Sequence, residues 1–211
     1  MRAGLFGGTF NPIHLGHLRA AEEICEALTL DRMVFIPANI PPHKEGHELA
    51  APTVRERCVA AAISENPLFE LSRVELDREG PSYSIDTIKH FVAEYSGAEL
   101  WFIVGEDAFA EIGSWYQFKE LFSLVNIAVM SRPPGIKAHI LPSIMEEEFF
   151  AEEWGYIHSS GNAVRFVSVT PLDISSTAIR EAIRAGRSIR YLVPETVREI
   201  LEKEDHFGPG E

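Results

Sequence analysis

The sequence has few cysteines, no excess of basic residues and no long uninterrupted apolar run. Its two cysteines, Cys25 and Cys58, lie within apolar helical patterns, so we interpret them as small buried hydrophobic residues rather than a disulfide framework. Free thiols favour a reducing compartment, and we expect the cytoplasm. The apolar stretch between Arg2 and Arg19 is broken by glycines, a proline and two histidines, which argues against both a membrane span and a signal peptide.

Positive charge is also scarce. Asp and Glu number 32 against 19 Lys and Arg, and the formal net charge is −13. A field of this sign repels a phosphate backbone, so we do not expect a nucleic-acid partner. What is present is the composition of a globular chain, with 211 residues of which 45% are hydrophobic and 24% charged. This length predicts one domain with at most a small appended subdomain.

Short β-rich runs alternate along the chain with amphipathic segments. Most of the runs are almost continuously apolar, which is typical of central parallel strands covered on both faces. The predicted strands span residues 3–6, 33–37, 69–74, 100–105, 126–131 and 164–169. Helical patterns between them predict a helix around residues 18–28, one that runs to about residue 63 after a capping box of Thr53 and Glu56, and one over 84–95.

This alternation predicts an α/β fold with a doubly wound, mostly parallel, Rossmann-like sheet that binds ligands at the carboxyl ends of its strands. Two further helices are predicted at 175–185 and 194–203, the second with Pro194 at its first position. We therefore expect a core over residues 1–173 and a small helical subdomain over 174–211, packed together as one functional domain. Residues 135–162 carry no motif that we can match, and their glutamates favour a solvated acidic helix.

The first predicted strand runs directly into glycines and then a helical pattern. Residues 7–17 read GGTFNPIHLGH. Glycines between a strand and a helix let backbone N–H groups approach a phosphate at the helix N-terminus, where the helix dipole favours anions. The segment contains neither the G-x-G-x-x-G fingerprint nor the G-x-x-x-x-G-K-[ST] loop, which disfavours an ordinary dehydrogenase or a P-loop enzyme.

Two histidines, His14 and His17, stand three residues apart at the predicted helix start with Gly16 between them. Alone, either is best interpreted as a capping or core histidine, and a metal pair would need a third ligand, for which we find no candidate at suitable spacing. Together with the glycines and Thr9 they favour contact with a phosphate, for which Gly16 leaves room. The segment resembles the His-x-Gly-His signature of the nucleotidyltransferase superfamily.

A second predicted anion site lies at residues 174–180, ISSTAIR. Hydroxyl groups gather at a helix N-terminus, and Arg180 follows Ser176 by one turn, so N–H groups, hydroxyls and a guanidinium can converge on one phosphate. A plain serine N-cap is the alternative, but a capping box would place Glu or Gln where Ala178 and Ile179 stand. The run resembles the I-S-S-T-x-I-R motif that this superfamily uses on the phosphates of ATP.

Three more segments narrow the resemblance. They are PPHK at residues 41–44, GPSYSIDT at 80–87, and GEDAF at 105–109 followed by Trp115 and Tyr116. Together they resemble the nicotinate-nucleotide adenylyltransferase family, from Leu5 to about Leu201. Asn11 stands where many members have Asp, and Ser84 where many have Thr.

The resemblance implies roles for individual residues. Catalytic roles fall to His14, His17, Lys44 and Arg180. The implied ATP contacts are Gly7, Gly8, Thr9, Phe10, His14, His17, Gly105, Arg132, Ile174, Ser175, Ser176 and Arg180. The implied contacts to nicotinate mononucleotide are Lys44, Ser84, Ile85, Asp107, Trp115 and Tyr116.

The implied reaction joins nicotinate mononucleotide to the adenylyl group of ATP, giving the deamido dinucleotide and pyrophosphate, with Mg²⁺ bound mainly through the ATP phosphates. Three alternatives remain open. They are another small adenylyltransferase such as the phosphopantetheine enzyme, a nucleotide sensor without activity, and a class I tRNA synthetase, which the acidic composition disfavours. The sequence does not decide whether the chain forms a homo-oligomer.

Overall fold

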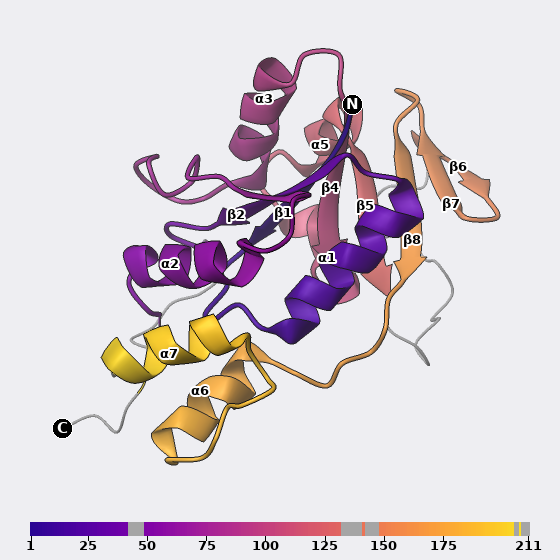
Figure 1. Ribbon diagram of the computed structural model, residues 1–211. Coiled ribbons are helices and arrows are strands. Elements are labelled where there is room, and N and C mark those ends of the chain that lie inside the picture. The colour runs from indigo at the N-terminus through magenta and orange to yellow at the C-terminus, as the bar shows by residue number, and fades with distance from the viewer. Residues whose placement is uncertain (42–48, 132–140, 142–147, 205–206, 208–211) are drawn as a thin grey trace.

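The structure, a computed structural model, describes residues 1–41, 49–131, 141, 148–204 and 207. Its centre is an eight-stranded sheet in the order β3-β2-β1-β4-β5-β8-β7-β6 (Figure 1). The strands are β1 Arg2–Gly8, β2 Arg32–Pro37, β3 Phe69–Leu71, β4 Glu99–Gly105, β5 Asn126–Ser131, β6 Phe149–Glu152, β7 Gly155–His158 and β8 Ala163–Ser168. All neighbouring pairs from β3 to β8 are parallel, and only the β6–β7 and β7–β8 pairs are antiparallel.

Helices cover both faces of this sheet, so the predicted doubly wound α/β fold is confirmed. The helices are α1 Leu15–Leu28, α2 Pro52–Ile63, α3 Ser84–Glu94, α4 Glu106–Ala110, η1 Ile112–Ser114, α5 Phe118–Leu124, α6 Ser176–Arg184 and α7 Glu195–Glu204. Helices α3 and α5 lie on one side of the sheet and α1 and α2 on the other (Figure 1). The strands are continuous apolar runs because both faces of the sheet are buried. In β1, for example, Leu5 packs into the core on one face and its neighbour Phe6 into the core on the other.

The six strands predicted from the apolar runs are all present, although β3 ends at Leu71 and not at residue 74. After β3 the chain turns, with the Val74 N–H donating to Ser72 Oγ at 3.3 Å. A serine side chain that bonds the backbone two residues on offers an alternative to the sheet ladder. The apolar pattern of residues 69–74 did not show this turn.

The acidic helix expected within residues 135–162 is wrong for its described part, which forms the β6–β7 hairpin. Phe149 packs on Phe122 with ring centroids 5.1 Å apart, whereas Phe150 is exposed. The described glutamates of this stretch therefore lie in or beside an antiparallel pair of strands and not on one face of a helix. Gly155 is required here, because a Cβ at that position would lie 2.0 Å from the Val164 carbonyl oxygen on β8.

Two predictions about helix ends also need correction or adjustment. The capping box of Thr53 and Glu56 is wrong, because Pro52 starts α2 one residue earlier and Ala51 is the N-cap. Pro194 directly precedes α7 and is not its first residue. The division at residues 173 and 174 stays a prediction, and it falls in the connection between β8 and α6 (Figure 1).

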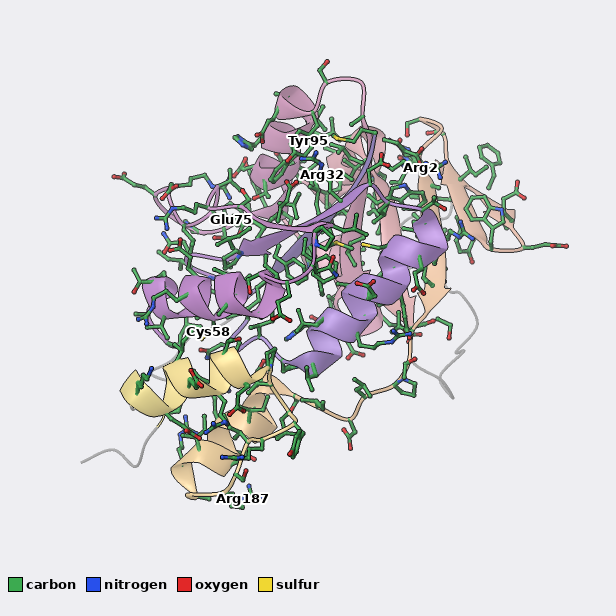
Figure 2. The ribbon with its side chains drawn as sticks, viewed as in Figure 1. Arg2, Arg32, Cys58, Glu75, Tyr95 and Arg187 are labelled. Carbon is green, nitrogen blue, oxygen red and sulfur yellow. The ribbon has the colours of Figure 1, made fainter. Side chains whose placement is uncertain are left out.

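Both cysteines are buried free thiols, as the sequence predicted. Cys25 belongs to α1 and Cys58 to α2, where Figure 2 labels it. Burial raises the pKa of the Cys25 thiol to about 12, so it is not a reactive thiolate at neutral pH. None of the helices in the described ranges is long and apolar enough to cross a membrane.

Candidate active site

The centre of the sheet is a topological switch point. From β1 the chain moves outward through β2 and β3, then returns to β4 on the other side of β1 and continues to β5. In open parallel sheets the carboxyl ends of two such strands diverge and leave a crevice for ligands. Two cavities lie here, of about 650 and 240 Å³, and both are lined by Phe6 of β1 and Gly105 of β4.

The larger cavity brings together residues that the sequence had placed in three separate motifs. Its lining includes Gly7, Gly8, Thr9, Ser84, Gly105, Trp115 and Tyr116, all predicted site residues. Gly7 and Gly8 end β1 and Thr9 follows it, Ser84 starts α3, Gly105 ends β4, and the last two follow η1. Residues far apart in the chain therefore converge because their strands end at the same edge.

Aromatic rings form one wall of the larger cavity. Trp115 packs its ring edge to face with Phe102 of β4, with centroids 6.2 Å apart. Tyr116 is 55% exposed and lies 4.9 Å from the ring of Tyr83. An indole held by a core phenylalanine while it lines a cavity provides a flat face for an aromatic ligand.

The first turn of α3 supplies hydrogen-bond donors to the same cavity. Ser84 and Tyr83 line it, and the early N–H groups of a helix have no acceptors in the preceding turn. The side chain of Ile85 is fully buried in the core, so this residue could contact a ligand only through its main chain.

Glu75 is a cavity residue that the sequence analysis missed. It accepts a hydrogen bond of 2.6 Å from the Thr87 hydroxyl of α3, and Figure 2 labels it near the start of that helix. Burial raises the pKa of this carboxyl, against the smaller lowering effect of its hydrogen bonds with Thr87 and Ser82. No periodic signal could have revealed it, since Glu75 lies between β3 and α3 in a segment without regular structure.

The smaller cavity contains His17 and Gly16, together with Glu106, Asp107 and Thr170. Asp107 thus lines the cavity that contains His17, and not the one that holds Trp115 and Ser84. It is the second residue of α4, a short helix whose first turn carries the carboxylates of Glu106 and Asp107. Among the described residues no group of three His, Cys, Asp or Glu side chains could hold a metal ion by itself.

The two histidines act on each other and on the helix. Their rings stack with centroids 3.7 Å apart, and they form a capping box at the start of α1 in which each side chain bonds the other residue's backbone. The capping interpretation is therefore correct, and for His17 it coexists with a place in the lining of the smaller cavity. Because the His14 N–H donates to His17 Nδ1 at 3.3 Å, the neutral His17 ring carries its proton on Nε2 and can donate from there.

Gly16 is needed for this arrangement. A Cβ at residue 16 would lie 3.0 Å from His14 Nδ1, closer than a packed ring tolerates without shifting. The same position lies 3.7 Å from the Ile174 carbonyl oxygen. Residues 16 and 174 are far apart in the chain. The His-x-Gly-His segment and the ISSTAIR segment are nevertheless neighbours in space.

The polar side chains of the ISSTAIR segment make hydrogen bonds within the protein. Ser175 is the N-cap of α6, accepting from the Ala178 N–H at 3.1 Å. Ser176 donates to the Pro12 carbonyl oxygen at 2.9 Å, and Arg180 donates to that of Asn11 at 2.9 Å. The first turn of α6 is thus fastened to the segment that joins β1 to α1.

Three predicted residues contribute less than expected or cannot be placed. The Phe10 ring is buried against Phe6, Phe35 and His17, so only its main chain is available to a nucleotide. Lys44 and Arg132 lie outside the residues that the structure describes.

Comparison with known proteins agrees with this geometry. The cytidylyltransferase-like family model matches residues 5–182. A protein of Geotalea daltonii described as a probable nicotinate-nucleotide adenylyltransferase is 43% identical over 100% of both chains. One of Geobacter metallireducens with the same description is 44% identical over 97% of each.

The chain belongs to the nicotinate-nucleotide adenylyltransferase family. The enzyme class predicted from its motifs is confirmed. A solved structure of Plasmodium falciparum nicotinic acid mononucleotide adenylyltransferase complexed with NaAD has a TM-score of 0.75 over 98% of this chain and 97% of that one. At 15% identity this likeness shows the shared fold, and the assignment to the family rests on the closer relatives.

Proposed function

We propose that the chain transfers the adenylyl group of ATP to nicotinate mononucleotide, the reaction of its family, releasing pyrophosphate and forming the deamido dinucleotide. The observation that carries this proposal is the pair of adjoining cavities at the β1–β4 switch point. One has an aromatic wall and a helix N-terminus, and the other contains His17 of the His-x-Gly-His segment. Two nucleotides can occupy them so that their phosphates meet beside Phe6 and Gly105.

On the ATP side the chain gathers hydrogen-bond donors and cations. We assign His14, His17, Arg180 and the N-termini of α1 and α6 to the phosphates, together with Lys44 and Arg132 from the family resemblance. Gly7, Gly8, Thr9, Phe10 and Ile174 to Ser176 would present main-chain groups or hydroxyls. These cations and dipoles offset the repulsion between two anionic substrates.

On the pyridine side, Trp115 stacks on the ring and Tyr116 and Ser84 flank it. A pocket that offers only N–H donors can bond both oxygens of a carboxylate, whereas the NH₂ of an amide would oppose a donor with another donor. The first N–H groups of α3, at Ser84 and Ile85, are of this kind. This arrangement favours the acid over the amide.

The chemistry itself needs little from the protein besides alignment. The attacking oxygen belongs to the phosphate monoester of nicotinate mononucleotide, whose second pKa is about 6, so it is ionised at neutral pH without a base. It forms a bond to the α-phosphorus of ATP while the bond to the leaving pyrophosphate breaks, and the charge on that pyrophosphate rises. His17 Nε2–H and Arg180 stabilise this developing charge.

A divalent cation fits the smaller cavity by the chemistry of its lining. Asp107, Glu106 and the Thr170 hydroxyl offer the hard oxygen atoms that Mg²⁺ prefers, and the ATP phosphates would supply the rest. When bound, Mg²⁺ neutralises part of the triphosphate charge. We propose Mg²⁺ as the cofactor on this basis, and the cytoplasm as the compartment from the two buried free thiols.

The experiment that tests the function is an acceptor panel. Pyrophosphate release from ATP is measured with nicotinate mononucleotide, nicotinamide mononucleotide or phosphopantetheine as the acceptor. We expect rapid release with the first, at least tenfold less in kcat/KM with the second because each mismatched buried donor costs about 1 to 3 kcal/mol, and none with the third. Release with phosphopantetheine alone would assign a different adenylyltransferase activity, and no release with any acceptor would indicate a nucleotide sensor.

A further inference from the structure

One buried cation has no part in the reaction described above. Arg55 lies on α2, is 1% exposed and is the largest fully buried side chain among the described residues. Its guanidinium donates to four backbone carbonyl oxygens, of Thr9 at 2.9 Å, Ala38 at 2.6 Å, Asn39 at 3.2 Å and Ala50 at 3.0 Å.

Within the described ranges Arg55 forms no ion pair with a carboxylate, and the four carbonyl acceptors named above are uncharged. Burial lowers the pKa of its guanidinium to about 10, which leaves the group protonated at neutral pH. Burying a charge without a counter-charge is costly, and an apolar side chain of similar size is often more favourable for stability. The position of this charge therefore calls for an explanation other than packing.

The carbonyls that Arg55 holds come from segments that surround the larger cavity. Thr9 follows β1 and Ala38 follows β2, and both line the cavity, whereas Arg55 does not. The two segments are also joined directly, since the Ala38 N–H donates to the Gly8 carbonyl oxygen at 2.9 Å. A carbonyl that points at Arg55 points away from the cavity, so its partial negative charge does not face a bound phosphate.

A second set of bonds extends the same arrangement. The Ala50 N–H donates to Asn11 Oδ1 at 3.0 Å, and the Asn39 N–H to Ser82 Oγ at 3.0 Å, next to the start of α3. The segments before α2, after β1 and before α3 are thus all connected to the Arg55 guanidinium, directly or through one further hydrogen bond. Removing it would release carbonyls toward the cavity and would remove a positive charge from behind residues 7–9.

We propose that Arg55 is a positioning residue for the phosphates of ATP: it turns the carbonyls of Thr9 and Ala38 away from the cavity and places an uncompensated positive charge behind the two glycines that end β1. The inference rests on the proposed function. It assigns to Arg55 an effect on charged ligands that a purely structural residue would not have, because a full charge in a low-dielectric interior acts over several ångströms.

The experiment compares a charged and an uncharged ligand of the same site. Equilibrium affinities for ATP and for adenosine are measured in the full-length protein and in Arg55→Met, with Arg57→Met as the matched control on the exposed face of the same helix. We expect Arg55→Met to weaken ATP at least tenfold, a difference of about 1.4 kcal/mol, with adenosine within twofold of wild type. Arg57→Met should leave both unchanged.

Equal weakening of ATP and adenosine, or an unchanged ATP affinity, would overturn the proposal. If Arg55→Met does not fold, as judged by circular dichroism and Tm, Arg55→Lys decides. The lysine keeps the positive charge but loses the planar set of guanidinium donors. ATP affinity should therefore fall about threefold to tenfold, with adenosine affinity unchanged. An ATP affinity equal to that of the wild type would contradict the positioning role of Arg55. Failure of the proposed function is distinguishable, because it would appear in the wild-type acceptor panel and not in the variants.

Discussion

The two cavities at the end of the sheet are built differently. Around the histidines the polar groups are already bonded to the protein, with His14 and His17 capping α1 and with Ser176 and Arg180 holding the segment before it. Around the larger cavity, Trp115 and Tyr116 lie in the loop between η1 and α5, and Tyr116 is largely exposed. Developing charge needs donors that are fixed before the reaction, whereas stacking on a ring tolerates adjustment. The comparison predicts steep losses on the first side and shallow ones on the second.

The largest effect is expected for His17→Ala. The Nε2–H of His17 is proposed to act on charge that develops during transfer, and loss of one such donor lowers kcat by about 10² to 10³. The side chain also bonds the His14 N–H, so the variant should lose about 1 kcal/mol of unfolding free energy but remain folded. Single-turnover rates and Tm check both parts, and a rate within threefold of wild type would remove His17 from the mechanism.

Arg180→Ala should come next, with an increase in the KM for ATP of about tenfold and a fall in kcat, because a charged group is lost that acts in the ground state and the transition state. Ser176→Ala serves as the comparison, since it removes the neighbouring hydroxyl bond to Pro12 without a change in charge and keeps the main-chain N–H that residue 176 would present to the phosphates. Steady-state kinetics at varied ATP separate the two variants. If they behave alike, Arg180 acts only by fastening α6 to the preceding segment.

Trp115→Ala tests the other side of the comparison. Stacking is worth about 0.5 to 1.5 kcal/mol, so kcat/KM should fall about threefold to tenfold for nicotinate mononucleotide and, by the same factor, for nicotinamide mononucleotide. The ratio between the two substrates should not change, because the indole does not distinguish acid from amide. A changed ratio would show that Trp115 takes part in selecting the acid.

The smallest effect concerns Glu75→Gln and the pH dependence of stability. Burial raises the pKa of Glu75 in the folded protein, so the folded state holds its proton more tightly than the unfolded state. The contribution of this group to stability is fully present below the unfolded value of 4.5 and is lost as pH rises through the raised folded value. Tm measured from acid to neutral pH should therefore fall in wild type relative to Glu75→Gln, and parallel profiles would contradict this.

The parts of the molecule that were predictable from sequence are those in which one local pattern had one structural solution. Apolar runs such as the one in β5 are buried on both faces, and the glycines at the end of β1 line a cavity at the carboxyl edge of the sheet. The β6–β7 hairpin was missed because its glutamates suggested a solvated helix. Glycine is needed at residue 155 because the backbone there lies against the Val164 carbonyl of β8. Such a contact is invisible before the strands are paired.

The site was predicted less completely than the fold for a similar reason. His14 and His17 were recognised by type and spacing, but their mutual capping depends on how α1 starts. Arg55 and Glu75 were missed because a charged residue in a sequence looks solvent-exposed, and only the tertiary structure supplies the four carbonyls of one and the Thr87 hydroxyl of the other.

Gly105, which borders both cavities, sets a limit on the size of whatever spans them. Its backbone has φ of −76° and ψ of 155°, which any residue adopts, and a Cβ there would find no atom within 4 Å. The folded chain alone therefore has no steric need for glycine at this point. The product of the proposed reaction would run past this position from one cavity to the other, and a methyl group would take up space at the passage between them. If the proposed reaction is correct, a protein with alanine at residue 105 should be as stable as the wild type but should form or release its product more slowly.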